Sequence, residues 1–313
     1  MGDTAEDEGD VMGSEPIEGS RILSEQNAEA ARHRLRAMAV SHSRAQRLAN
    51  ARMGVSLLLA VAGLATALLP GLTVSVTVLG GLWAVAYSVG LTSWESSEAR
   101  RAALLQELFD VRLFRLEWNS AFAGTPPAPQ QVSSLSRRFR GAEAELRDYY
   151  EIPELPHPYD VLACQQQNLG WGARVRRRYA RTVLTAMLVW LGAGLVVGLS
   201  ARMSVLDLVL LWYLPSLGAV MMGLDVCRTQ WQVAAERERV MELLEARVTA
   251  GGDTAALLAF ARQVQDVIFQ SRQRYTRVPD WFFRHFKSTD RADFQAAMND
   301  LQALVGRRTP QPG

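Results

Sequence analysis

Four long stretches of the chain are almost free of charged side chains. Residues 54–72 and 73–91 form the first pair, with a Pro-Gly turn signal between them, and residues 182–199 and 205–224 form the second pair. A helix of about 19 residues is about 28 Å long, close to the ~30 Å thickness of the hydrocarbon core of a bilayer. The pattern therefore predicts four membrane-spanning helices arranged in two hairpins.

The fourth stretch contains two residues that interrupt its apolar pattern. Asp207 falls near the outer end of the stretch, where a carboxylate can reach the membrane interface, and Pro215 falls near its centre. Proline removes a backbone donor and clashes with the preceding turn of a helix. We therefore expect the fourth helix to bend there.

Arginine residues gather at one end of each apolar stretch. They precede the first and third stretches and follow the second and fourth, whereas Arg202 lies in an outer turn. Positively charged residues beside spanning helices stay on the cytoplasmic side. We therefore expect a multi-pass membrane protein with both termini and the long middle segment in the cytoplasm.

The remaining segments have the apolar periodicity of helices that pack on one another, most clearly over residues 94–117, 132–146 and 255–274. The predicted fold class is all-α: an integral membrane protein with a cytoplasmic helical domain assembled from N-terminal, central and C-terminal segments. The expected divisions are a disordered acidic tail (1–21), an N-terminal helix (22–52), the first hairpin (53–91), a cytoplasmic helical region (92–181), the second hairpin (182–224) and C-terminal helices (225–313).

Composition narrows the chemistry that the chain can perform. The net charge is only +2, which is not the charge of a protein that coats polymeric nucleic acid. Cys164, Cys227 and four scattered histidines do not have the spacing of a zinc site or of a disulfide framework. The sequence also lacks a phosphate loop and a nucleophile elbow. We therefore expect a protein that is not an enzyme and has no catalytic residues, metal or cofactor.

Five short groups of residues stand in order along the chain. They are Glu-Leu-Phe-Asp at 107–110 with Trp118-Asn119, Leu-Arg-Asp-Tyr-Tyr at 146–150, Cys-Gln-Gln-Gln-Asn-Leu at 164–169 with Arg-Val-Arg-Arg-Arg-Tyr at 174–179, Arg-Gln-Val-Gln-Asp at 262–266, and Pro-Asp-Trp-Phe-Phe at 279–283. Together with the two hairpins, these groups resemble the S-4TM family of pore-forming effectors. The resemblance extends over residues 22–300.

That family accompanies cyclic-nucleotide-synthesising enzymes in bacterial anti-phage systems of the CBASS type. The resemblance implies an inner-membrane effector that binds a cyclic oligonucleotide through its cytoplasmic part, disrupts the membrane or forms pores as a homo-oligomer, and causes abortive infection. The residues themselves leave two alternatives open. One is a constitutive membrane scaffold that recruits a soluble partner through its cytoplasmic helices. The other is a small transporter, which the scarcity of ionisable residues in the four stretches disfavours.

Two groups of residues suit such a nucleotide ligand, because guanidinium groups bind phosphate and aromatic rings stack on bases. The first group precedes the third apolar stretch and comprises Asn168, Trp171, Arg174, Arg176, Arg177 and Arg178. The second group is Trp118 with Asn119. Arginine just before a spanning helix also anchors that helix on anionic headgroups, and tryptophan also packs in cores. The residues alone therefore allow both interpretations.

Two further sets of residues have structural interpretations. Asp110 and Arg147 are charged residues within apolar segments, and we predict that they form an ion pair between two cytoplasmic helices. The pairs Gly194 with Gly198 and Gly80 with Ala84 have the small-xxx-small spacing that allows spanning helices to pack closely.

Overall fold

The computed structural model describes residues 19–65, 69–86, 90, 92–273 and 278–307. These residues form helices and connecting turns, and none of them is in a strand, which confirms the all-α prediction for the described part of the chain. The predicted acidic tail falls almost entirely on residues 1–18, which lie outside the described residues. Residues 19–21 belong to the first helix.

The described chain is built from a few very long helices and several short ones. In the first half these are α1 (Gly19–Glu25), α2 (Glu29–Ala65), a 3-10 turn (Pro70–Leu72), α3 (Thr73–Ala86), α4 (Thr92–Phe114), α5 (Ser120–Ala123), α6 (Pro129–Ser136) and a second 3-10 turn (Glu143–Leu146). In the second half they are α7 (Tyr159–Ser200), α8 (Val205–Leu208), a π-helical segment (Val209–Tyr213), α9 (Leu214–Ala250), α10 (Thr254–Gln273) and α11 (Asp280–Gly306).

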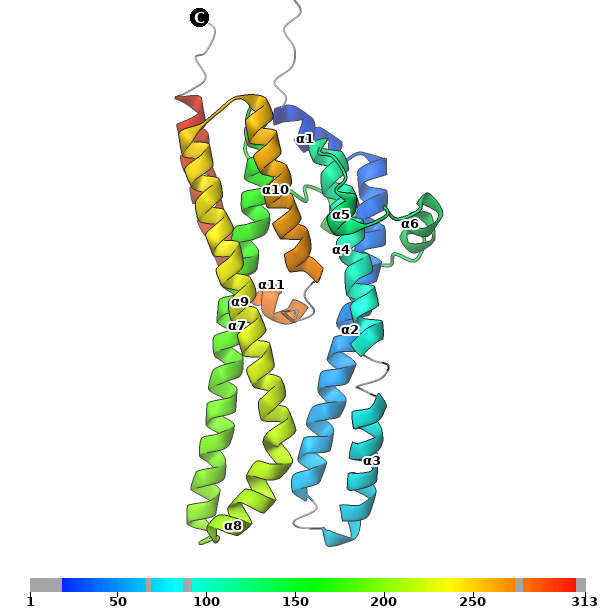
Figure 1. Ribbon diagram of the computed structural model, residues 1–313, viewed down its shortest axis with the longest axis vertical. Helices are drawn as coiled ribbons and strands as arrows, with labels where there is room; N and C mark the ends of the chain where they lie inside the picture. The colour runs from blue at the N-terminus through cyan, green and yellow to red at the C-terminus, as the bar shows by residue number, and fades with distance from the viewer. Residues whose placement is uncertain (1–18, 66–68, 87–89, 91, 274–277, 308–313) are drawn as a thin grey trace, which may run out of the picture.

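The long helices form two arms that extend to the same end of the molecule (Figure 1). The first arm is α2 with α3, and a hydrogen bond of 3.1 Å from Trp83 Nε1 to Ser56 Oγ joins its two helices. The second arm is α7 with α8 and α9, which pack side by side along most of their length. The described termini lie at the opposite end of the molecule, beside α4, α10 and α11 (Figure 1). We call this opposite end the helical head.

The hydrophobic core lies in the helical head. Side chains from α2, α4, α7, α9 and α10 bury one another there, including Leu35, Phe109, Leu162, Leu244 and Ile268. Burying a Leu, Ile or Phe side chain contributes about 1.5–3 kcal/mol, so this core supplies the main cohesion between segments that are distant in the sequence. The predicted assembly of one domain from N-terminal, central and C-terminal segments agrees with this core.

The far ends of the two arms have the opposite character, because their large apolar side chains are exposed. Leu58, Val74, Leu199 and Val205 are 71%, 75%, 71% and 80% exposed. Within the described residues, one helix, α7, is long and apolar enough to cross a bilayer, and the bent pair Val205–Tyr213 and Ser216–Ala250 would be a second. A shorter apolar helix covers Val74–Trp83. The described structure thus has two apolar hairpins, but by length and composition only α7 is a candidate membrane span as a single unbroken helix.

The bend predicted in the fourth apolar stretch is present. The axes of segments 205–213 and 216–250 differ by 62°, and the residues just before the break are π-helical. Proline 215 occupies the first turn of α9, where its missing N–H leaves no partner unsatisfied. Trp190 Nε1 donates to Ser216 Oγ at 2.9 Å, so α7 supports the turn that follows the bend.

The close packing predicted for Gly194 and Gly198 is present in the second hairpin, whereas Gly80 of the first hairpin makes no close contact among the described residues. A Cβ atom added to Gly194 would lie 2.4 Å from the indole of Trp212, and one added to Gly198 would lie 3.0 Å from Leu208. In the described residues nothing lies within 4 Å of a Cβ atom added to Gly80. The side chain of Ala84 is outside the described part of the structure.

The helix predicted over residues 132–146 is wrong. Helix α6 ends at Ser136, and residues 143–146 form only a 3-10 turn. Residues 137–142 between these elements contain Gly141 and are not helical, and Arg36 of α2 binds Glu143 on the far side with an Nε–Oε1 distance of 2.7 Å. The side chains of Val132, Leu135 and Leu146 are still buried in the core. Their spacing therefore predicted burial correctly, although the residues do not lie on one continuous helix.

Candidate ligand-binding site

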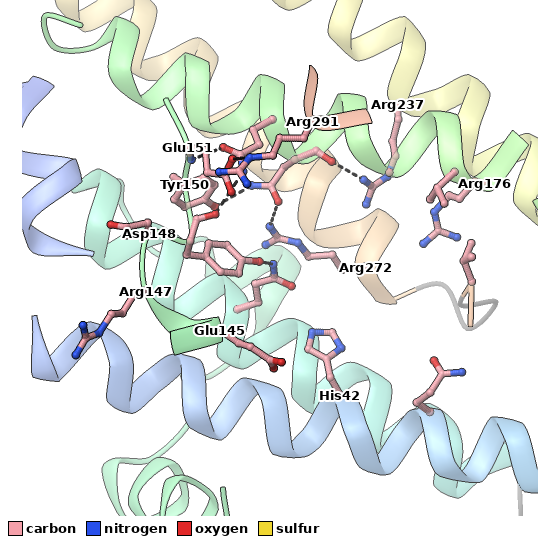
Figure 2. A pocket seen from close by; sticks show the side chains of 18 of the residues that line it. His42, Glu145, Arg147, Asp148, Tyr150, Glu151, Arg176, Arg237, Arg272 and Arg291 are labelled. Carbon is pink, nitrogen blue, oxygen red and sulfur yellow. Dashed lines mark hydrogen bonds and ion pairs between the residues drawn. The ribbon is translucent and has the colours of Figure 1, made fainter. Parts of the chain in front are cut away.

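A cavity of about 690 Å³ lies between the two arms, at the base of the helical head. Its walls come from α2 and α4 on one side and from α7, α9, α10 and α11 on the other, with the loop at residues 144–151 closing one end (Figure 2). Five arginines line it, namely Arg147, Arg176, Arg237, Arg272 and Arg291. Three carboxylates line it as well, namely Glu145, Asp148 and Glu151.

Several of these charges are already matched by a neighbour. Arg291 Nε lies 2.6 Å from Glu151 Oε2, and Asn27 Nδ2 donates to Asp148 Oδ1 at 2.8 Å. With histidine neutral, five arginines against three carboxylates leave the cavity wall with an excess of positive charge. Such a wall favours an anionic occupant.

Asp110 is the centre of a buried hydrogen-bond network behind this wall. The carboxylate is fully buried and accepts from Tyr150 Oη at 2.6 Å, from Arg272 Nη1 at 2.7 Å and from Gln265 Nε2 at 3.0 Å. Burial, followed by the charge of Asp110, raises the pKa of Tyr150 well above its usual value, so Tyr150 stays a hydroxyl donor. The network fixes α4, α10 and the loop at residues 144–151 relative to one another.

The predicted ion pair between Asp110 and Arg147 is therefore wrong. The cation that reaches Asp110 is Arg272 of α10, whose side chain is 7% exposed. Arg147 is exposed and lies at the end of the cavity remote from Arg176 (Figure 2). The main chain at Arg147 is extended, with φ −82° and ψ 150°, so this residue does not continue a helix that would face α4.

A second buried carboxylate, Glu107, lies one helical turn from Asp110 on α4. It accepts from Arg262 Nη2 at 2.8 Å and from Gln265 Nε2 at 2.8 Å. Burial raises the pKa of Glu107, and the hydrogen bond from Arg262 opposes that rise. Gln265 thus bridges the two carboxylates and extends the network along the contact between α4 and α10.

Asn168 of α7 connects this network to the cavity. Its Nδ2 donates to Tyr150 Oη at 2.8 Å, and its Oδ1 accepts from Arg272 Nη2 at 3.0 Å. Its main-chain carbonyl accepts from Arg237 Nη1 at 2.8 Å. Asn168 therefore lines the cavity with its polar groups engaged, and it sets the positions of Arg272 and Arg237.

Arg237 of α9 is the most unusual charge in the wall. The residue is 6% exposed, Nη2 donates to Ser271 Oγ at 2.8 Å, and Nε has no hydrogen-bond partner in the described structure. Among the described residues, no carboxylate lies within ion-pair distance of its guanidinium. Burial, followed by repulsion from Arg176 and Arg272, lowers the pKa of Arg237 well below its usual value. The wall thus contains a buried cation held by neutral groups.

A family model for the SMODS-associating 4TM effector domain matches residues 20–301 of the chain, which include both arms and every wall of the cavity. The chain belongs to this family. A protein of Bacillus cereus (strain VD146) named as a probable CBASS effector molecule is 24% identical over 272 residues, covering 84% of this chain and 92% of that protein. No solved structure matches the chain.

Only part of the basic group predicted before the third apolar stretch reaches the cavity. Arg176 lines it, whereas Arg177 forms an ion pair with Glu238 of α9, and Arg178 lies over the ring of Phe286 at 4.8 Å. Arg174 is half-buried outside the cavity lining. Trp171 lies within α7, but its side chain is outside the described part of the structure.

The second predicted group, Trp118 with Asn119, does not line the cavity and makes structural contacts. Trp118 Nε1 donates to the carbonyl of Gly124 at 2.7 Å. Asn119 caps α5 by accepting from the main chain of Ala121, and its Nδ2 donates to Asp266 Oδ2 at 2.9 Å. These contacts hold the α4–α5 connection on α10.

Three residues of the cavity wall, Arg237, Arg272 and Tyr149, were not among the ligand-binding residues predicted from the sequence. Arg237 and Arg272 occur in long helices rich in charged residues, where exposure to solvent is the usual state. Only the packing of α9 and α10 on α7 buries them. Tyr149 was part of a group of residues that resembled the family, and its hydroxyl accepts from Gln106 Nε2 at 2.6 Å on the cavity wall. Burial raises the pKa of Tyr149 to about 12.

Proposed function

We propose that this chain is the membrane effector of a CBASS-type anti-phage system. In this proposal a cyclic oligonucleotide made during infection binds the cavity, and the apolar arms then disrupt or perforate the inner membrane and cause abortive infection. The observation that carries the proposal is the arginine-rich cavity between the two arms. Its walls include helices that run without interruption into the apolar ends, so one ligand can act on both arms.

The size and chemistry of the cavity suit a phosphorylated ligand of small-molecule size. Ligand sites commonly enclose about 300–1,000 Å³, a range that includes this cavity. Guanidinium groups bind phosphate oxygens through two parallel hydrogen bonds, and arginines from four different helices, α7, α9, α10 and α11, line the wall. The ring of Tyr149 offers an aromatic surface beside them.

The proposed topology has four membrane spans, with the helical head and both termini in the cytoplasm. Its support is the exposure of the apolar side chains on both arms, which would be unfavourable in water and is the normal state of residues that face lipid. The described termini lie at the head end, as this topology requires (Figure 1). Four helices enclose little space, so the proposed active state is a homo-oligomer.

The proposed mechanism is a shift between two populations, a resting state and an open or assembled state. A ligand can drive this shift only if it binds the second state more tightly than the first. Moving the equilibrium from 1:99 to 99:1 requires a differential affinity of about 5.5 kcal/mol. The cavity can supply such a difference, because its shape depends on the relative position of two arms that belong to different parts of the chain.

The direct test is membrane potential in cells that express the chain with or without a cyclic-nucleotide synthase. We expect depolarisation only when the synthase is active, and no depolarisation with a synthase whose catalytic carboxylates have been replaced. A chain that leaves the potential unchanged in both cases would instead fit the scaffold alternative. A chain that dissipates ion gradients equally in both cases would contradict messenger control.

A further inference from the structure

We propose that Arg237 and Arg176 form a phosphate-binding subsite where α7 crosses α9. The inference rests on the proposed function in that the phosphate would belong to the messenger, yet it concerns a defined pair of side chains and can be tested with a simple phosphate. The ligand class is a phosphate or phosphodiester group. Two sources share this chemistry, a soluble nucleotide and an anionic lipid headgroup.

The first argument is the charge state of the wall. Of the cavity arginines, Arg272 is neutralised by Asp110, and Arg291 is paired with Glu151. Arg237 is buried without a carboxylate partner among the described residues and is hydrogen-bonded to two neutral acceptors. A buried guanidinium of this kind is unfavourable unless an anion completes its environment.

The second argument is the arrangement of hydrogen-bond donors. Arg237 Nε is buried and has no partner in the described structure, so the guanidinium keeps one unsatisfied donor. Arg176, which donates from Nη1 to Gln230 Oε1 at 2.6 Å, lines the same part of the cavity. Figure 2 shows both guanidinium groups directed into the space between α7 and α2. Two converging guanidinium groups repel each other, and a phosphate between them would offset that repulsion.

The third argument is that the backbone makes room for Arg237. A Cβ atom added to Gly172 of α7 would lie 1.9 Å from Arg237 Nη1 and 2.7 Å from its Cζ. The guanidinium therefore lies against the main chain of α7, in a place that only glycine leaves open. Any side chain at position 172 would displace Arg237 from the position in which it faces Arg176.

The main experiment uses the full-length protein in detergent, with inorganic pyrophosphate as the probe and sodium chloride added to equalise ionic strength. We compare thermal stabilisation and affinity in the wild type, in Arg237→Met and in Arg138→Gln, an exposed arginine outside the cavity. Loss of one charge-assisted contact weakens binding by about 10- to 100-fold. We expect that loss in Arg237→Met and wild-type behaviour in Arg138→Gln.

The melting temperature without pyrophosphate separates a ligand role from a structural one. If Arg237 serves a ligand, its replacement by Met removes an uncompensated buried charge, and the melting temperature of the free protein stays the same or rises. A marked fall in that temperature, with the pyrophosphate response preserved, would overturn the inference. A wild-type protein that does not respond to pyrophosphate would also overturn it, while a depolarisation experiment in cells would still decide the proposed function separately.

A second variant preserves the charge and keeps the inference testable if Arg237→Met fails to fold. Gly172→Ala leaves both arginines in place but forces the guanidinium of Arg237 to move, so we expect weaker pyrophosphate binding at unchanged net charge. Gly218→Ala is the matched control, because nothing lies within 4 Å of a Cβ atom added there in the described structure. Equal responses in Gly172→Ala and the wild type would contradict the subsite.

The source of the phosphate is decided in nanodiscs. Discs of phosphatidylcholine and discs that contain phosphatidylglycerol are compared with and without pyrophosphate. Stabilisation by phosphatidylglycerol that disappears in Arg237→Met would support the subsite and assign it to a lipid headgroup. Stabilisation that requires a soluble phosphate in both kinds of disc would support the subsite and assign it to a nucleotide.

Discussion

Replacement of Asp110 by Asn tests the network that holds the helical head together. The carboxylate neutralises Arg272 and accepts the hydroxyl of Tyr150, and all three groups are buried. An amide keeps the shape but removes the negative charge, which leaves the Arg272 guanidinium without its counter-ion. Breaking a buried ion pair in this way costs about 3–5 kcal/mol.

The expected change in melting temperature follows from that free energy. For a chain of this size each 1 kcal/mol corresponds to about 2–4 °C, so Asp110→Asn should melt about 6–20 °C below the wild type. The assay is differential scanning fluorimetry of the full-length protein in detergent. Glu29→Gln is the control, because Glu29 forms an exposed ion pair with Arg36, and such pairs add little to stability.

The double variant Asp110→Asn with Arg272→Met provides the sharper test of the cause. Removal of both charges eliminates the uncompensated cation, so the double variant should recover much of the lost stability. If Asp110→Asn melts like the wild type, the ion pair does not hold the head together. If the double variant is less stable than the single variant, the loss arises from packing or from hydrogen bonds and not from the unpaired charge.

Three other predictions follow from buried groups. Burial raises the pKa of Glu107 above the ordinary carboxyl pKa of 4.5, so the contribution of this group to the free energy of unfolding is present at low pH and is lost as the pH rises above 4.5. Glu107→Gln should flatten that part of the stability–pH curve. Gly194→Val should cost about 1–3 kcal/mol by overpacking against Trp212, whereas Gly192→Val, with open space, should not. Cys164 is fully buried, and burial raises the pKa of its thiol, so iodoacetamide should label it only after unfolding.

The features that depend on local chemistry could be predicted from the sequence. The Pro215 bend follows from a missing backbone donor, and the two hairpins follow from the spacing of apolar stretches and turn residues. The path of residues 132–146, by contrast, could not be predicted from the spacing of apolar residues. Their apolar spacing correctly marked buried positions, but the chain leaves the helical path at residues 137–142, around Gly141.

The candidate site was predictable only in part. Asn168 and Arg176 belong to a conspicuous polar and basic segment of α7, and both line the cavity. The partner of Asp110 was not predictable, because 162 positions separate it from Arg272 and only the packing of α10 on α4 brings them together. Arg237 had no signal in the sequence either. Its importance arises from burial, and burial of a charged residue in a surface-like helix is a property of the assembled fold.

The contacts between α7 and α9 indicate which motion a ligand in the cavity could cause. These helices are joined beside the cavity by the Arg177–Glu238 ion pair. Further toward the apolar ends they are joined by the hydrogen bond from Cys227 Sγ to the carbonyl of Ala180 and by Met187 packed against Gly223.

Met187 and Gly223 lie about 21–23 Å along their helices from the Gly172–Arg237 crossing, at ~1.5 Å per residue. An anion bound at Arg237 would therefore move α7 and α9 together as one arm and would not separate them. The cavity has its other wall on α2, so the conformational change that fits the structure is a displacement of the second arm relative to the first. In the proposed topology that displacement would occur inside the bilayer, where the exposed apolar faces of both arms could meet those of neighbouring subunits.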